Sequence, residues 1–213
     1  MKKTKIAALC VAAALVAAAA IAGTLAFFTD AKGTVNNQFT LAGGGDSKGV
    51  EIDLYENDVD YDEATQLWTA TVSTTSEGVE YENIYPGAEL PKNPKVENTG
   101  DYKAFVRMDV TVDEKLAEYY PAIVDINGDW ATVSQTGNVY TYIWGTKAAP
   151  AELEIGEATD PIFTTVSIPS YLELEDMQDI DDSVLGVDAY AIQTAGAETS
   201  ELVDALLALT KPE

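Results

Sequence analysis

Apolar and polar side chains alternate between residues 103 and 112, and this pattern constrains the fold more than any other in the chain. The apolar members of the alternation are Val106, Met108, Val110 and Val112. Arg107 and Asp109 lie between them, and we expect Arg107 to face solvent and to pair with neighbouring acids. A period of two residues is the signature of a β-strand that buries one face. The stretch therefore predicts a half-buried strand.

Similar patterns recur along the chain. Alternation, or a run of β-branched and aromatic residues, predicts further strands at 50–55, 68–73, 139–144, 162–168 and 187–193. The acidic segment 57–65, between the first two of these, is expected to be a loop. Tyr140, Tyr142 and Trp144 share one face of their strand, and core packing explains them better than a ligand-binding platform does.

Asn127 and Gly128 form a strong signal for a hairpin turn. The apolar segments that flank this turn span 123–126 and 130–133. Asp125, Asn127 and Asp129 also have the alternating spacing of the oxygen ligands in a calcium loop. The EF-hand pattern requires glycine after its third ligand, whereas here Trp130 follows Asp129. We therefore favour a hairpin turn over a metal site, with no cofactor expected and weak calcium binding left open.

Two short helices are expected. The first covers 113–120, which starts with acidic residues of the kind that helix N-termini favour. The second runs from Ser200, as N-cap, to about residue 209. The acidic stretch 176–182 is expected to be a solvated loop, with weak calcium binding as the alternative. Many strands and few helices predict an all-β domain at 49–213, a jelly-roll-like β-sandwich with a short helix near the C-terminus.

The first 26 residues have the features of a secretory signal peptide. A basic start, which contains Lys2, Lys3 and Lys5, is followed by a long apolar run. Thr24 and Ala26 are the small residues required at positions −3 and −1 of a cleavage site. We therefore predict cleavage between Ala26 and Phe27, after which no stable membrane span remains. Cleavage after Ala22 and a retained membrane anchor are the alternatives.

Residues 27–48 are expected to form an N-terminal arm that starts at Phe27 and ends in a glycine-rich linker. Val35, Phe39 and Leu41 occupy odd-numbered positions, so an extended arm would place them on one face. Such a strand could complete the sheet of a neighbouring copy, and head-to-tail addition of this kind produces a filament. Pairing of the arm with its own domain is the alternative, and the sequence favours neither.

Composition excludes several classes of function. The chain has 36 acidic and 12 basic residues, a net charge of −24, and loss of the signal peptide would change this charge to −27. General nucleic-acid binding is excluded because it needs a basic surface. The chain has no histidine, and its only cysteine is Cys10, so histidine-based nucleophile systems and zinc sites are excluded as well. We expect no enzymatic activity, with glycoside hydrolysis by paired carboxylates as the remaining alternative.

Four stretches carry a resemblance to one known family. They are TLAFFTD at 24–30, NIYPGAELPKNPKVENTGDYKAFVRMDVTV at 83–112, GEATDPIFTTVSI at 156–168 and DAYAIQTAG at 188–196. The second stretch contains a Pro-Gly turn, a K-x-P-x-V-x-N-T-G motif and a strand of the A-[FY]-V-R type. Together they resemble the TasA/camelysin family of secreted proteins from Gram-positive bacteria, in its signal-peptide end, central block and later strands.

The resemblance implies a jelly-roll β-sandwich that a signal peptidase of the SipW type releases to the cell surface or the extracellular matrix. Family members there self-associate and build biofilm fibres. Camelysin itself is classed as a metalloprotease, but this chain has no HExxH motif and we expect no such activity. The predicted function is a secreted structural subunit of a fibre. A monomeric adhesion module of the cell surface and a hydrolase are the alternatives.

Overall fold

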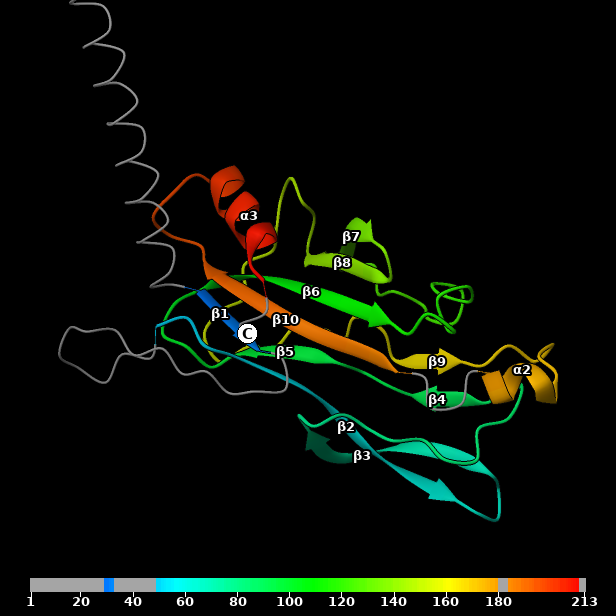
Figure 1. Cartoon of the computed structure of the whole chain (residues 1–213). Helices are drawn as coiled ribbons and strands as arrows, with labels where there is room; N and C mark the ends of the chain where they lie inside the picture. Colours follow the sequence, from blue (N-terminus) through cyan, green and yellow to red (C-terminus); the bar gives the residue numbers. More distant parts are fainter. Residues whose placement is uncertain (1–28, 33–48, 180–183, 211–213) are drawn as a thin grey trace, which may run out of the picture.

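The computed structural model describes residues 29–32, 49–179 and 184–210 (Figure 1). In these ranges the chain consists mainly of β-strands in antiparallel sheets, with two short helices. The prediction of an all-β sandwich with a few short helices, one of them near the C-terminus, is confirmed. None of the helices in these ranges has the length and the apolar character needed to span a bilayer.

One layer of the fold is a five-stranded antiparallel sheet. In spatial order its strands are β1 (Thr29–Lys32), β10 (Leu185–Gln193), β6 (Ala104–Val112), β8 (Val139–Trp144) and β7 (Trp130–Thr136). β6 and β10 are neighbours inside the sheet and pair along the full length of both strands. The strands predicted from alternation at 103–112 and 187–193 are therefore the two central partners.

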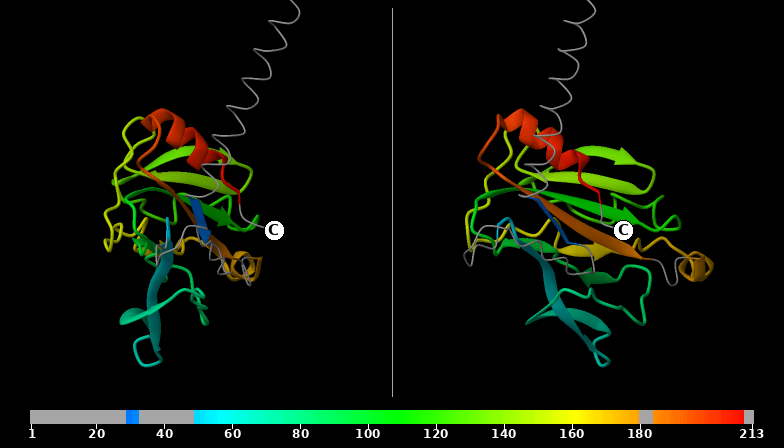
Figure 2. Two further views of the ribbon diagram at one scale, coloured as in Figure 1. Left: turned by 90° about the vertical axis from the view of Figure 1, so that its left-hand side faces the viewer. Right: turned by 60° about the vertical axis from the view of Figure 1, so that its left-hand side comes forward.

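The facing layer is built from shorter sheets. β3 (Leu67–Thr75), β2 (Ile52–Asp62) and β5 (Lys95–Asn98) form one of them, and β4 (Glu89–Pro91) pairs with β9 (Thr165–Ser167) in the other. β2 and β3 form a hairpin whose far end extends away from the five-stranded sheet, as the turned views in Figure 2 show. This hairpin leaves β3 at the edge of its sheet.

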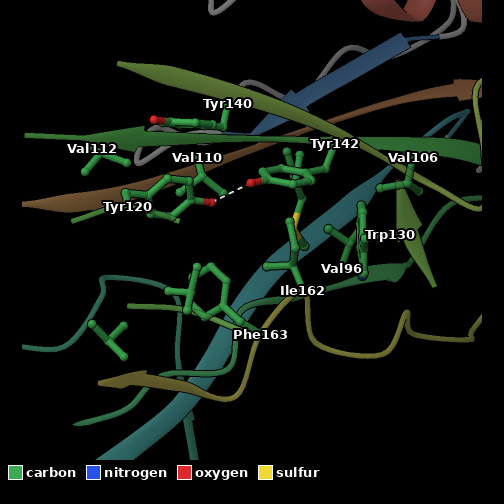
Figure 3. Close-up of a cluster of buried hydrophobic side chains, with 14 of the residues drawn as sticks. Val96, Val106, Val110, Val112, Tyr120, Trp130, Tyr140, Tyr142, Ile162 and Phe163 are labelled. Carbon is green, nitrogen blue, oxygen red and sulfur yellow. Dashed lines mark hydrogen bonds between the residues drawn. The ribbon is translucent and has the colours of Figure 1, made fainter. Parts of the chain in front are cut away.

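The main hydrophobic core lies between the two layers (Figure 3). Its almost fully buried members include Val96, Val106, Met108, Val110, Ile162 and Phe163. Tyr140 and Tyr142 also lie in this core, as the sequence predicted. The hydroxyl oxygens of Tyr120 and Tyr142 are 2.6 Å apart, so each buried hydroxyl has a hydrogen-bond partner.

The opposite face of the five-stranded sheet is covered in part by α3 (Thr199–Ala208) (Figure 1). A second apolar cluster lies between them and contains Phe105, Ile143, Tyr190, Ile192, Leu202, Val203 and Leu206. β6 is therefore buried on both faces. The prediction that Arg107 faces solvent is wrong, because α3 covers this face and leaves Arg107 only 5% exposed.

The predictions about helices hold only in part. The predicted C-terminal helix is α3, but Ser200 is not its N-cap, and no side chain caps its first turn. Residues 113–120 form turns, because the stretch is short and Tyr120 precedes a proline, which disfavours helical backbone. α2 (Leu174–Asp179) replaces part of the loop predicted at 176–182, and the remainder of that stretch lies outside the described residues.

β2 is longer than predicted. The prediction of a loop at 57–65 is wrong for most of that segment. Residues 57–62 continue β2 and pair with β3. Asp58, Asp60 and Asp62 occupy exposed positions that alternate with more buried ones. Acidic side chains that point to solvent are compatible with a strand, so the charge of this segment misled the prediction.

The hairpin predicted around Asn127 and Gly128 is also wrong. The two residues do form a turn, since the Trp130 N–H donates to the Asn127 carbonyl oxygen at 2.9 Å. However, β7 pairs with β8, and the segment 123–126 contributes only an isolated bridge, from Val124 to the facing layer. Ile123 and Val124 are apolar because they fill the core, not because they form a strand.

Candidate functional site at the outer edge of β10

β1 lies on the outer edge of β10, and this pairing is the candidate functional site. The two strands are antiparallel, with Thr29 opposite Ile192 and Lys32 opposite Ala189. Residues 189–192 form the part of the outer edge of β10 on which β1 lies, and we call this part the arm-binding edge. Because β1 belongs to the predicted arm, part of the arm pairs with its own domain in this structure.

The arm-binding edge is the most buried part of β10. Residues 189–192 are each at most 4% exposed, whereas residues 185–188 are half-buried. Ala189 and Ala191 belong to the main core, and Tyr190 and Ile192 belong to the cluster under α3. β1 therefore joins the sheet at a place where both faces of its neighbour are already covered.

Backbone hydrogen bonds explain why a strand binds at this place. The edge of a sheet presents a row of N–H and C=O groups that can pair with any extended segment. Each such bond contributes about 1 kcal/mol net, so a four-residue strand is held by a few kcal/mol. β1 also lies next to β2 of the facing layer (Figure 1). The pairing thus fixes the position of β1 on β10 through only a few backbone hydrogen bonds.

The residues predicted to act in processing and assembly lie outside the described ranges. They are Ala26 and Phe27 at the cleavage site, and Phe27, Val35, Phe39 and Leu41 in the arm. Their roles stay predictions. The described part of the arm is β1, which begins shortly after the predicted cleavage site and shows where one segment of the arm pairs.

Arg107 links α3 to the five-stranded sheet next to the arm-binding edge. Its Nε donates to Asp109 Oδ1 at 3.0 Å, and its Nη2 donates to Asp109 Oδ2 at 2.5 Å. Its Nη1 donates to the carbonyl oxygens of Leu206 (2.7 Å) and Leu209 (3.1 Å), at the C-terminal end of α3. The guanidinium carbon lies 4.1 Å from the centroid of the Tyr190 ring. Ion pairing, hydrogen bonding and stacking together make burial of this cation tolerable.

Sequence reasoning missed this cluster, although one signal was present. The predicted C-terminal helix has an apolar face, which needs an apolar surface to cover it. Phe105, two residues before Arg107 in β6, and Ile192 provide that surface on the second face of the sheet. The apolar face of the predicted helix therefore indicated that some apolar surface is covered, but not that this surface lies on β6.

The environment of Tyr190 keeps its hydroxyl protonated. Burial raises the pKa of this hydroxyl, and the nearby carboxylates of Asp109 and Asp188 raise it further, while the Arg107 cation acts in the opposite direction. Asp109 and Asp188 are directly opposite in the register of β6 and β10. The neutral phenol therefore serves as a packing and stacking group between the sheet and α3.

The candidate calcium ligands form a turn. Asn127 Oδ1 accepts the N–H of Asp129 at 3.0 Å, so the spacing of these residues serves local backbone geometry. Asp125 and Asp129 are exposed. Among the residues that the structure describes, no group of three or more Asp, Glu, His or Cys side chains is arranged to hold a metal ion. Weak calcium binding stays a prediction.

Comparison of the chain with protein-family models, with curated proteins and with solved structures gives no match. Family membership is therefore not shown, and the resemblance to the TasA/camelysin family remains an expectation based on the quoted stretches. The β1–β10 pairing, the sequence of the arm and the charge of the chain are the observations that bear on function.

Proposed function

We propose that the protein is a secreted structural subunit of the cell surface or extracellular matrix, and that it assembles into fibres. In this assembly the N-terminal arm of one copy pairs with the arm-binding edge of the next. The β1–β10 pairing carries the proposal, because β1 is part of the arm and adds to a single strand edge. A second copy could form the same register without any change in β10.

Exchange of the arm between copies would be a heterologous contact, since the donor strand and the receiving edge are different surfaces. Contacts of this kind continue from copy to copy unless the rotation between copies closes a ring. Pairing within one chain and pairing between chains use the same backbone bonds. Protein concentration and the effective concentration of the tethered arm therefore decide between them. Fibres should form at high local concentration and dissociate on dilution.

The sequence supports the location of such a fibre. The first 26 residues predict secretion, and the resemblance to the TasA/camelysin family supports processing by a SipW-type peptidase. Without the signal peptide the net charge is −27, so copies repel one another in dilute salt. Assembly should therefore increase with ionic strength, because screening weakens repulsion between exposed like charges.

A monomeric adhesion module of the cell surface is the second candidate. One observation favours it: β1 occupies the arm-binding edge of its own chain and leaves this edge closed. In such a protein the arm would complete its own sheet and would have no role in contacts between copies.

Cysteine pairs can distinguish the two candidates, since the only native cysteine, Cys10, lies in the predicted signal peptide. Asp30 and Ala191 are directly opposite in the β1–β10 register, within reach of a disulfide after replacement of both. The proposal expects disulfide-linked dimers when an Asp30→Cys variant and an Ala191→Cys variant are mixed under oxidising, fibre-forming conditions. A mixture of Asp30→Cys and Val187→Cys is the out-of-register control and should not cross-link.

The opposite result is equally clear. If the mixed single variants stay monomeric while the Asp30→Cys/Ala191→Cys double variant forms an internal disulfide, the arm pairs only within its own chain. Electron microscopy of the same samples should then show no fibres, and the adhesion module would replace the fibre subunit.

A further inference from the structure

Two elements from opposite ends of the chain meet on β10. The backbone of Tyr190 is opposite Ala31 of β1, and the backbone of Ile192 is opposite Thr29. The side chains of Tyr190 and Ile192 belong to the cluster that α3 covers. The main-chain groups of even-numbered residues in β10 face β6, because Val184 and Thr194 at its two ends bond Asp113 and Lys103 on that side. The main-chain bonds to β1 therefore fall on Ala189 and Ala191, and β1 and α3 hold alternate residues of the same short stretch of β10.

Arg107 occupies the next position in this arrangement. It is directly opposite Tyr190 in the β6–β10 register, so Ala31, Tyr190 and Arg107 lie side by side across three strands. Its guanidinium stacks on the Tyr190 ring and binds the last carbonyl oxygens of α3. One row of residues therefore connects the end of α3 with the strand of the arm.

α3 depends on these contacts for its own stability. It has ten residues, no side-chain cap at its N-terminus and no basic residue in its last turn. Isolated helices of this length are marginal in water, and a positive charge near the C-terminus stabilises a helix. Arg107 supplies that charge from the sheet. α3 should therefore be stable as a helix only while it is docked on the sheet.

We propose that α3 regulates the arm-binding edge: when α3 is docked it orders β10 and strengthens the binding of β1, and when α3 detaches the arm is released. Two segments that order the same strand stabilise each other, because the second to bind has less entropy to remove. This coupling is a property of the single molecule. Its consequence for fibres, that α3 controls arm exchange, rests on the proposed function.

The first experiment measures amide hydrogen exchange in the protein without its predicted signal peptide, at a concentration where the protein is monomeric. Arg107→Met removes the charge but keeps an apolar stem. We expect the protection of the α3 amides to fall. The protection of the β1 amides should also fall, by about tenfold, which is within the usual range of coupling between two sites. Leu206→Ala, which weakens α3 packing and keeps the Arg107–Asp109 pair, should act in the same way and serves if Arg107→Met does not fold.

The control separates coupling from general loss of stability. Val96→Ala removes a buried group of the main core on β5, away from α3. This variant lowers the stability of the whole protein without touching α3. Protection of the β1 amides, divided by protection of the amides that exchange only on global unfolding, should therefore stay at its value in the unchanged protein. If α3 loses protection in either α3 variant and β1 keeps its own, the proposal is overturned.

Linkage provides the reverse test, because coupling between two sites must be reciprocal. Proline at both Asp30 and Ala31 removes two adjacent N–H groups of β1, whichever of them faces β10. α3 should then lose protection by a factor at least as large as the one that β1 loses in Leu206→Ala, because Leu206→Ala weakens the docking of α3 only in part. Unchanged protection of α3 would refute the coupling. These measurements concern the monomer, so they can succeed or fail independently of the cysteine cross-linking that tests fibre formation.

Discussion

Asn98 shows how one residue of the central block organises the backbone around it. The side chain is fully buried, and its Nδ2 donates to the carbonyl oxygens of Tyr102 (2.8 Å) and Leu153 (3.0 Å). Its Oδ1 accepts the N–H of Gly100 at 3.1 Å. Every hydrogen bond joins the amide to main chain, so the N-T-G part of the motif serves the turn after β5 and needs no ligand to explain it.

Gly100 is the position of this turn that tolerates no side chain. A Cβ there would lie 2.5 Å from the carbonyl oxygen of Gly49 and 2.6 Å from the nitrogen of Glu51, both main-chain atoms. Gly100→Ala should therefore lower the free energy of unfolding by about 1–3 kcal/mol. Gly128→Ala, with no atom within 4 Å, should change it by less than about 0.5 kcal/mol. Urea unfolding of both variants checks this, and equal losses would contradict it.

The ion pair between Lys92 and Glu56 is the second prediction at this scale. Lys92 Nζ lies 2.8 Å and 3.0 Å from the two carboxylate oxygens, and the side chains are only 11% and 6% exposed. Lys92→Met leaves the Glu56 charge buried and unpaired, which should cost about 3–5 kcal/mol. Lys103→Met is the matched control, because Lys103 and its partner Glu154 are about half exposed in solvent and should contribute little. Thermal unfolding distinguishes the two, and a small effect at Lys92 would disprove the argument.

Among the elements, strands that carry their signal locally were predictable. The alternation that defines β6 is visible in the sequence because its main-core face carries only apolar side chains, whereas Arg107, Asp109 and Thr111 lie on the other face. What the sequence did not show was the partner of each face. Arg107 looks like a solvent-facing residue until α3, almost one hundred residues later, covers it. Residues 123–126 look like a strand because the core requires apolar side chains there.

The candidate site consists of β1 and the arm-binding edge, and only the β1 part could be predicted from the sequence. The sequence predicts an extended arm after a signal peptide, and β1 is the part of this predicted arm that the structure describes. The arm-binding edge does not follow from the sequence, because pairing between Thr29 and Ile192 depends on tertiary structure that brings the two ends of the chain together. The same reason hides the role of Tyr190, whose main chain and side chain serve different neighbours.

β3 offers a prediction about edge strands. It lies at the edge of its sheet and has no charged residue, and Val72 within it is 99% exposed. The register between β2 and β3 shifts between Asn57 and Val59, next to this position, which interrupts regular pairing. Val72→Lys should leave the unfolding temperature unchanged and reduce aggregation on heating, because a charge on an edge opposes pairing with another edge. Val72→Thr, which keeps the strand uncharged, is the control; light scattering that does not differ between them would contradict the prediction.

For the whole molecule, buried phenols set the response to high pH. Five hydroxyl groups have a pKa that is raised chiefly by burial: those of Tyr55, Tyr81, Tyr120, Tyr142 and Tyr190. In the unfolded chain these groups ionise near pH 10, whereas the folded protein keeps them neutral. The folded state therefore binds more protons at high pH. The contribution of these phenols to stability is constant below about pH 9, and stability should fall as the pH rises above about 10. Denaturant unfolding across this range tests it, and stability that increases there would contradict the assignment.

The position of β10 also determines the order in which the molecule can be completed. Among the described residues β10 is the last strand, and its outer neighbour β1 is the first. A chain that is synthesised from its N-terminus releases β1 long before the strand that β1 pairs with has emerged. Closing so long a loop is slow, and strands that pair across it join late in folding. Every newly made molecule therefore passes through an interval in which its own arm has no place to bind, and this interval is when an edge on an already folded neighbour has least competition.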